Sequence, residues 1–265
     1  MSVTLAYDPG LARVRVAVDA LPAATVYVRV DRSVNGVQWT TVRGGDRLTP
    51  AAGAARVDDY EFAPGVATTW RARAYSAVDV VLGTQTAATT AAIDRVWLKS
   101  VARPYLNRSI VTQQYTPVQR KARAGVFDVP GRSFPVVVSD VAGSRQWTLS
   151  VLTSTPAEAH ALEVMLASGD ILHVQVPAGV DIPGGYVSVG DVELARVSRP
   201  LRDPRRLVSI PMTECAAPGP DVVGYTATWA GLLAAFGSWT AVLAAFPSWA
   251  AVLEYVAAPD TVIVP

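Results

Sequence analysis

The feature that most constrains this fold is a period-two alternation of apolar and polar residues through residues 1–92. It is clearest in ARVRVAV (12–18) and ATVYVRVDR (24–32), where valines stand at every second position. Because successive side chains of a strand point to opposite faces, this pattern predicts strands with one buried face. Asn35-Gly36 supplies a hairpin turn, since both residues tolerate positive φ. Short strands separated by turn residues predict a β-sandwich.

A second region, residues 93–217, also has strand-like segments, but one helix interrupts them. Thr155 suits the N-cap of this helix, Pro156 its first position and Glu158 the capping box. The helix is expected to end at Gly169. Its predicted buried face consists of Ala161, Leu162, Met165 and Leu166. One helix among strands predicts a mixed α+β barrel after a linker at 86–94, so the expected fold class is mainly β with some α.

The third region, residues 218–265, repeats a ten-residue phrase three times, and no charged residue occurs between Asp221 and Glu254. Large apolar residues stand at i, i+3, i+4 and i+7 of each unit, which is the stripe of a two-turn helix. One continuous helix would bring successive stripes about 80° out of step, so we expect an arm of three short helices. The candidate contact residues of this arm are Trp229, Leu233, Phe236, Trp239, Leu243, Phe246, Trp249 and Leu253.

Three roles are open for the arm. A membrane span needs ~20 apolar residues, and this run is long enough, but Gly237-Ser238 and Pro247-Ser248 interrupt it and no Lys or Arg flanks it. Tryptophans can stack on sugars, yet here they share a stripe with Leu and Phe, which favours burial. Helices of ~8 residues are not stable alone in water. We therefore expect the arm to cover a neighbouring subunit, without stable membrane insertion.

The residues that could carry chemistry do not form a catalytic pattern. His160 and His173 have no clustered partners, whereas a metal site needs three or four ligands. Cys215 is the only cysteine and has no histidine near it in the sequence. Asp58 and Asp59 are adjacent, so a strand directs them to opposite faces, and we interpret them as turn or edge residues. We expect a protein that is not an enzyme and has no metal, cofactor or small-molecule substrate.

The net charge of +1 argues against a general polyanion binder. Between Arg95 and Arg132, however, eight Lys or Arg residues accompany one acid, Asp128. This stretch could be a solvated face, a nucleic-acid contact or a surface matched to an acidic neighbour. Since no stacking aromatic residues are interleaved with it, no specific nucleic acid is expected. The interface candidates in this stretch are Arg95, Lys99, Arg103 and Arg108.

Residues 1–20 show no basic start followed by an apolar run, so no secretion signal is expected. The phrases VDRSVNGVQWTTVRGG and VDDYEFAPGVATTWRARAYSA resemble a fibronectin type III domain over about residues 10–92. The resemblance lies in an aromatic residue in the strand after a hairpin and in the alternating run from Trp70 to Ala74. It implies a sandwich fold and leaves the function open.

The remainder of the chain resembles minor tail proteins, including distal tail proteins, of long-tailed bacteriophages that infect actinobacteria. The matching phrases are IDRVWLKSVARPYLNRSI (93–110), GRSFPVVVSD (131–140), AEAHALEVMLASGDILHVQVP (157–177), GGYVSVGDVELARV (184–197) and RRLVSIPMTEC (205–215), followed by the tryptophan repeat. The repeat departs from the family where an acidic residue is expected, because Gly231, Ala241 and Ala251 stand there.

This resemblance implies a structural subunit of the virion tail tip, made in the host cytoplasm. Such a subunit would form a homo-oligomeric, hexameric ring and would contact the tail tube protein, the tail hub and other minor tail proteins. Two alternatives from other classes remain open. One is an adhesin that binds glycans of the host surface, and the other is a membrane-tethered protein.

Overall fold

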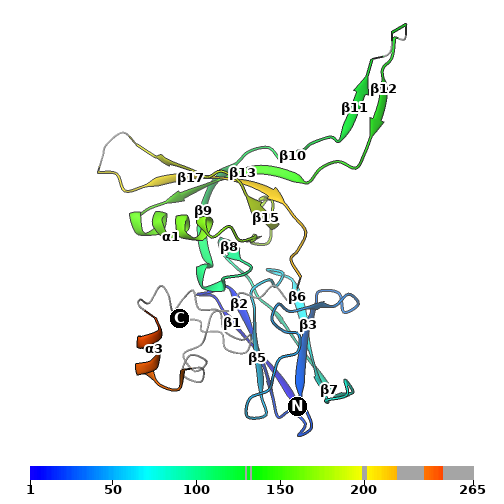
Figure 1. Cartoon of the computed structure of the whole chain (residues 1–265), viewed down its shortest axis with the longest axis vertical. Helices are drawn as coiled ribbons and strands as arrows, with labels where there is room; N and C mark the ends of the chain where they lie inside the picture. The colour runs from blue at the N-terminus through cyan, green and yellow to red at the C-terminus, as the bar shows by residue number, and fades with distance from the viewer. Residues whose placement is uncertain (129, 132, 199–201, 220–235, 247–265) are drawn as a thin grey trace.

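The computed structural model describes residues 1–128, 130–131, 133–198, 202–219 and 236–246. Strands dominate and the helices are few and short, so the predicted fold class, mainly β with some α, is confirmed. Figure 1 shows two stacked units, the lower one built from strands β1 to β7 and the upper one from strands that follow β7. A two-stranded hairpin projects from the upper unit.

The lower unit is a sandwich of two antiparallel sheets, with strand orders β1–β2–β5 and β4–β3–β6–β7. The strands are β1 (Ser2–Asp8), β2 (Arg13–Asp19), β3 (Tyr27–Ser33), β4 (Thr40–Thr41), β5 (Ala55–Asp59), β6 (Ala67–Tyr75) and β7 (Val81–Thr90). The alternating valines of β2 and β3 point inward, and the core also contains Phe62 and Trp70. Burial of these apolar faces is what holds the two sheets together.

The upper unit is a barrel. Its strands follow the order β13–β9–β8–β14–β15–β17, and β17 pairs back with β13 to close the ring, while β10 and β16 extend it. The strands are β8 (Val96–Ser100), β9 (Arg108–Tyr115), β10 (Gln119–Arg120), β13 (Arg145–Thr153), β14 (Leu172–Gln175), β15 (Gly185–Val189), β16 (Glu193–Arg196) and β17 (Arg206–Glu214). Inward side chains such as Leu98, Leu149 and Ile210 fill the interior.

Helix α1 (Pro156–Ala167) begins where the sequence predicts. The Thr155 hydroxyl accepts a hydrogen bond from the backbone N–H of Glu158 at 3.2 Å, which is the N-cap bond. The Glu158 carboxylate accepts from the N–H of Ser154 at 2.7 Å rather than from that of Thr155. The capping interaction is therefore confirmed, with its return bond displaced by one residue.

The buried face of α1 is close to the predicted one. Leu162 and Met165 are buried in the barrel core, as predicted. The buried alanine is Ala159, whereas Ala161 is only partly buried. Gly169 follows the helix with φ +71°, a conformation that favours glycine at a helix end.

Two strand predictions are wrong in extent. The segment 86–94 is not mainly a linker, because β7 continues to Thr90 and pairs with β6 along its length. Its small residues suit this position, since β7 is an edge strand with exposed side chains. Within the strand-like segments of the second region, residues 184–194 look like one strand in the sequence but form two, β15 and β16, which pair with different parts of β17.

The projecting hairpin consists of β11 (Ala124–Phe127) and β12 (Val136–Ser139). Among the described residues these two strands pair only with each other, and they lie outside the barrel. Backbone bonds from Asp140 N to Arg123 O and from Gly143 N to Lys121 O, both 2.8 Å, continue the pairing below the hairpin.

Helix α3 (Trp239–Ala245) lies within residues 236–246, the described part of the repeats in the C-terminal arm. The Ser238 hydroxyl accepts from the N–H of Ala241 at 3.2 Å, so Ser238 is the N-cap of this helix. The apolar stripe predicts that Phe246 belongs to the helix. Instead, Phe246 is the C-cap residue and has extended backbone. Of the remaining candidates, Phe236 is described and packs its ring edge-on against that of Phe246, with centroids 5.3 Å apart. Trp229, Leu233, Trp249 and Leu253 lie outside the described residues.

Asp59 lies on an edge strand, as interpreted, but its side chain is not exposed at that edge. Although β5 is an edge strand, the Asp59 carboxylate is buried and forms an ion pair with Arg32. It also accepts hydrogen bonds from Trp70 Nε1 and from the backbone N–H of Glu61, both at 2.9 Å. One buried carboxylate thus connects both sheets of the sandwich.

We expect Asp59→Asn to lower the free energy of unfolding by about 3–5 kcal/mol, because Arg32 would lose its buried counter-charge. Denaturant unfolding measures this change. Asp94→Asn is the matched control, because the Asp94 side chain is 90% exposed, and it should change stability by less than about 0.5 kcal/mol. Equal effects of the two substitutions would contradict the assigned role of Asp59.

Candidate functional site

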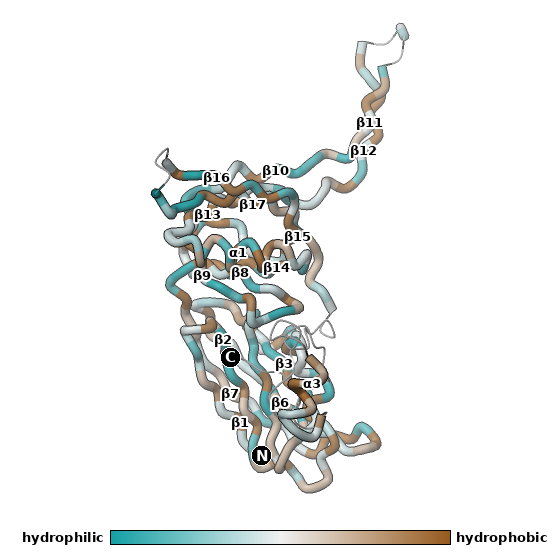
Figure 2. The backbone as a smooth tube through the Cα atoms, turned by 60° about the vertical axis from the view of Figure 1, so that its left-hand side comes forward, coloured by the Kyte–Doolittle hydropathy of each residue, from teal (hydrophilic) through white to brown (hydrophobic). Residues whose placement is uncertain are grey.

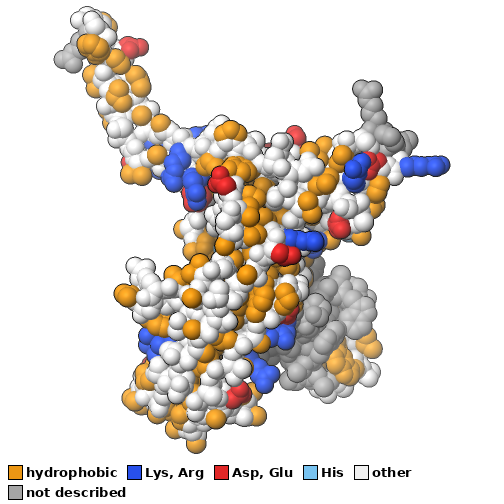
Figure 3. All heavy atoms as spheres, turned by 180° about the vertical axis from the view of Figure 1, so that it is seen from behind, with side chains coloured by type: hydrophobic (Ala, Val, Ile, Leu, Met, Phe, Trp, Pro, Cys, Tyr) orange, Lys and Arg blue, Asp and Glu red, His pale blue; other side chains and the backbone are white. Residues whose placement is uncertain are grey.

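The β11–β12 hairpin carries a concentrated exposed apolar surface. Val126 is 62% exposed, Phe127 58% and Val138 62%, and Phe134 near the tip is 84% exposed. Figure 2 shows hydrophobic residues along both strands, and Figure 3 shows their side chains covering the projecting arm. Exposed apolar patches of this kind mark interaction sites on soluble proteins.

Both faces of the hairpin are apolar. Paired residues share a face, so Phe127 and Val136 lie on one face and Val126 and Val137 on the other. The Phe127 ring lies back over Gly125, since a side chain added there would meet the ring at 2.8 Å. An isolated two-stranded hairpin is only marginally stable in water. Both faces of this hairpin therefore expose apolar side chains that a contact could remove from water.

The root of the hairpin is basic. Arg120, Lys121 and Arg123 are exposed and precede β11 directly, and Figure 3 shows basic side chains gathered where the hairpin leaves the barrel. Arg120 lies 4.0 Å from the carboxylate of Glu214. Part of the basic stretch noted in the sequence thus lies beside the apolar β11–β12 hairpin.

A groove of about 220 Å³ lies between α1 and β16. It is lined by Ala159, Glu163, Leu166, Ala167, Val192, Leu194 and Val208, of which only Glu163 is charged. Leu194 is 52% exposed, and β16 is the last strand of its sheet, so no described strand pairs with its outer edge. In Figures 1 and 2 this end of the barrel lies opposite to the hairpin.

Lys99 is not part of a basic surface, contrary to the sequence prediction. Its side chain is buried at the junction of the two units, where the ammonium group donates to the carbonyl oxygens of Ala12 at 2.5 Å and Tyr60 at 2.7 Å. Burial lowers the pKa of Lys99 to about 7, against the raising influence of the Asp59 and Glu61 carboxylates. Lys99 lies on strand β8 of the barrel, and its side chain reaches carbonyl groups of the sandwich.

Further polar contacts secure the junction. Gln175 of β14 donates to the carbonyl oxygen of Phe62 at 2.7 Å. Burial lowers the pKa of His173 to about 4 and raises that of Tyr186 to about 12, and these two rings pack at 4.9 Å. His173 is therefore neutral at physiological pH, with no sign of a ligand set around it: among the described residues no group of three potential metal ligands occurs.

A hollow runs beside this junction along the outer face of the first sheet. Arg43 lines it and donates to the carbonyl oxygens of Pro218 at 3.3 Å and Gly219 at 2.5 Å, so the C-terminal region starts at its rim. Arg43 also pairs with Glu61 at 2.7 Å. The amino group of Lys99 and the carboxylate of Glu61 line the hollow, but both already bind partners within the protein.

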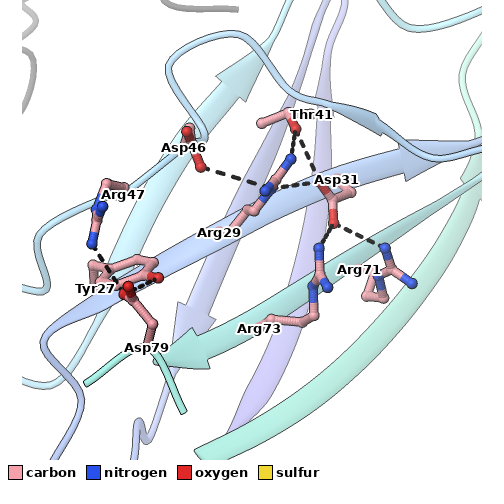
Figure 4. A network of polar contacts seen from close by, with 9 residues as sticks. All are labelled: Tyr27, Arg29, Asp31, Thr41, Asp46, Arg47, Arg71, Arg73 and Asp79. Atoms are coloured by element: carbon pink, nitrogen blue, oxygen red, sulfur yellow. Dashed lines mark hydrogen bonds and ion pairs between the residues drawn. The ribbon is translucent and has the colours of Figure 1, made fainter. Parts of the chain in front are cut away.

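The outer face of the second sheet carries a dense ionic network (Figure 4). Asp31 is buried and accepts from Arg71 at 3.0 Å and Arg73 at 2.7 Å. Burial opposes its ionisation, but these arginines outweigh burial and lower the pKa of Asp31. This carboxylate offsets the repulsion of Arg29 and Arg73, which stand directly opposite each other on β3 and β6.

The aromatic rings of this face contact neighbours on the same face. Tyr27 and Tyr75 stack with ring centres 4.7 Å apart, and Arg47 covers Tyr27 at 4.5 Å. Arg71 lies over the Trp39 ring at 4.0 Å. Such ladders stiffen the sheet. The ring faces that they use are not available for stacking on a sugar.

The remaining basic candidates, Arg95, Arg103 and Arg108, contact different partners and do not form one cluster. Arg95 and Arg103 are exposed, at 62% and 47%, and pair weakly with Asp94 and Asp170. Arg108 is partly buried and donates to the carbonyl oxygen of Leu106 at 3.2 Å. The sequence analysis thus did not identify the hairpin as an exposed apolar surface. Its signal was present in the run PVVVS, whose unbroken valines lack the polar alternation of a one-sided strand.

Comparison with known proteins adds no identity, because the chain matches no protein-family model and no curated protein sequence. Within the described residues, no helix has the length and apolar character needed to cross a membrane.

We expect the stability that Lys99 contributes to rise with pH between about 7 and the ordinary lysine value of about 10.4. The folded-state pKa is lowered, so the unfolded chain binds more protons throughout this window. The free energy of unfolding should increase from pH 7 to about pH 9.5 in the native protein relative to Lys99→Met, as measured by urea unfolding.

Lys121→Met is the control for that measurement, because Lys121 is exposed and is the only other lysine. It should show no pH-dependent difference from the native protein. A difference between native protein and Lys99→Met that stays constant with pH would contradict the lowered pKa.

Proposed function

We propose that this protein is a structural subunit that assembles with copies of itself. The observation that carries the proposal is the β11–β12 hairpin, which projects from the barrel with apolar side chains on both faces. In a lone molecule this surface would stand in water. Contact with another subunit removes it from water and supports a hairpin that is marginal by itself.

The assembly that fits best is a ring in the tail tip of a bacteriophage, in the manner of a distal or minor tail protein. The combination of a sandwich, a barrel with one helix and an aromatic C-terminal arm supports this proposal through the sequence resemblance. The expected ring is hexameric and lies between the tail tube and the tip complex, in the virion. Its contacts are the tail tube protein, the tail hub and other minor tail proteins, and no bond is made or broken.

The alternative of a glycan-binding adhesin has less support. The sandwich presents aromatic residues, but Tyr27, Tyr75 and Trp39 already contact one another or arginines. The arm has one described helix, in which Val242 is buried while Trp239 and Leu243 are 44% and 67% exposed. An arm that is partly packed and partly exposed suits a second contact between subunits.

We expect the native protein to have the mass of a closed ring in solution and the triple variant Phe127→Thr, Val137→Thr and Val138→Thr to be monomeric. Threonine keeps the strand propensity but removes apolar surface from the contact. Light scattering coupled to size-exclusion chromatography measures the masses. The matched control replaces Val78, Val80 and Val81, which are also exposed, by threonine. A monomeric native protein, or equal masses for all variants, would overturn the proposal.

Ending the chain after Gly219 tests the arm separately. This truncation keeps both hydrogen bonds of Arg43 to Pro218 and Gly219, so the two units should still fold cooperatively, as thermal unfolding measures. We expect the ring to dissociate at higher protein concentration than the native ring does, because the arm contributes part of the contact. A truncated protein that assembles as tightly as the full chain would show that the arm does not hold subunits together.

A further inference from the structure

We propose that the groove between α1 and β16 of one copy receives the β11–β12 hairpin of the next copy. The inference rests on the proposed self-assembly and names the surface that accepts the hairpin. It makes the contact head-to-tail, with different surfaces of the two copies meeting.

The size and lining of the groove favour a side chain of another protein over a small ligand. Its volume of about 220 Å³ is below the ~300–1,000 Å³ of small-molecule pockets. The lining is almost wholly apolar and lacks the convergent polar groups that orient a ligand. Phe127 and Phe134, which are 58% and 84% exposed on the hairpin, are aromatic groups of the kind that anchor protein interfaces.

The open edge of β16 offers backbone contacts next to the groove. β16 is the terminal strand of its sheet, and all four of its residues are exposed. An exposed edge is a template for an additional strand. Within the part of the chain that the structure describes, the strands of the hairpin likewise pair only with each other, so each has one edge without a neighbouring strand. A hairpin strand added to β16 would bring alternate side chains over the groove.

Charge agrees with this pairing. Glu163 is the only charged residue that lines the groove, whereas the root of the hairpin carries the exposed basic residues Lys121 and Arg123. Opposite charges at the rim of an apolar contact select the partner and its orientation.

The positions of the hairpin and the groove indicate that the hairpin bound in the groove belongs to a second copy of the chain. The hairpin points away from the barrel, and the α1–β16 end lies on the opposite side (Figures 1 and 2). A chain therefore cannot place its hairpin in its own groove. Contacts between unlike surfaces repeat from copy to copy, and they form a ring when the rotation between copies closes.

Cysteine trapping in full-length protein tests the contact. All variants carry Cys215→Ser, which removes the only native thiol. One set carries Phe127→Cys, Phe134→Cys or Val137→Cys in the hairpin, and the other carries Leu194→Cys in the groove. Disulfides form only where Cα atoms approach to about 4.4–6.8 Å. After oxidation, a mixture of the two sets should give a cross-linked pair on a non-reducing gel.

A chain that carries both a hairpin cysteine and Leu194→Cys should give a ladder of cross-linked species that ends at the ring. The control replaces Leu194→Cys by Val80→Cys, which is exposed on the sandwich, and should give no cross-link. If rings of native mass form but none of the three hairpin positions cross-links to Leu194→Cys, the inference is overturned and self-assembly stands. If no ring forms in native protein, the proposed function itself fails.

Discussion

The buried amino group of Lys99 is the contact on which the arrangement of the two units depends. Lys99 lies on β8 of the barrel and donates to two carbonyl oxygens of the sandwich, at Ala12 and Tyr60. A buried polar group needs partners that replace water, and here the partners belong to a different unit. Gln175 repeats this arrangement from the neighbouring strand β14. Separation of the units would leave these groups without their bonds, so the junction favours one rigid body over two domains on a flexible linker.

A rigid body is what a subunit of a ring requires. The hairpin and the α1–β16 groove belong to the same barrel, whose closure by β13 and β17 fixes their relative direction. If a contact between unlike surfaces is to close after a set number of copies, the angle between those surfaces must be constant. The sandwich, joined through Lys99, would then project from each subunit in one orientation. Its arginine ladder around Asp31 stiffens the outer sheet and adds to this constancy.

Much of the fold could be predicted from local pattern. The valines of β2 and β3, the N-caps Thr155 and Ser238 and the helix end at Gly169 all follow from neighbours in the sequence. Asp59 lies on an edge strand as predicted and Lys99 does not lie on a basic surface, but the burial of both side chains was not foreseen, because each depends on partners far away in the sequence. The candidate site was predicted only in part, since the basic root of the hairpin was noted and its apolar strands were assigned to the barrel.

The sequence by itself determined which segments form strands and helices, because periodicity and capping are properties of residues a few positions apart. Only the tertiary structure decided where those segments lie. Val136, Val137 and Val138 have the composition of a core strand, yet they project into solvent because the barrel closes through β13 and β17 without them. Lys99 has the composition of a surface residue, yet it is buried because two carbonyl oxygens from residues 12 and 60 converge on it. Both outcomes depend on contacts between residues far apart in the chain, which no local pattern encodes.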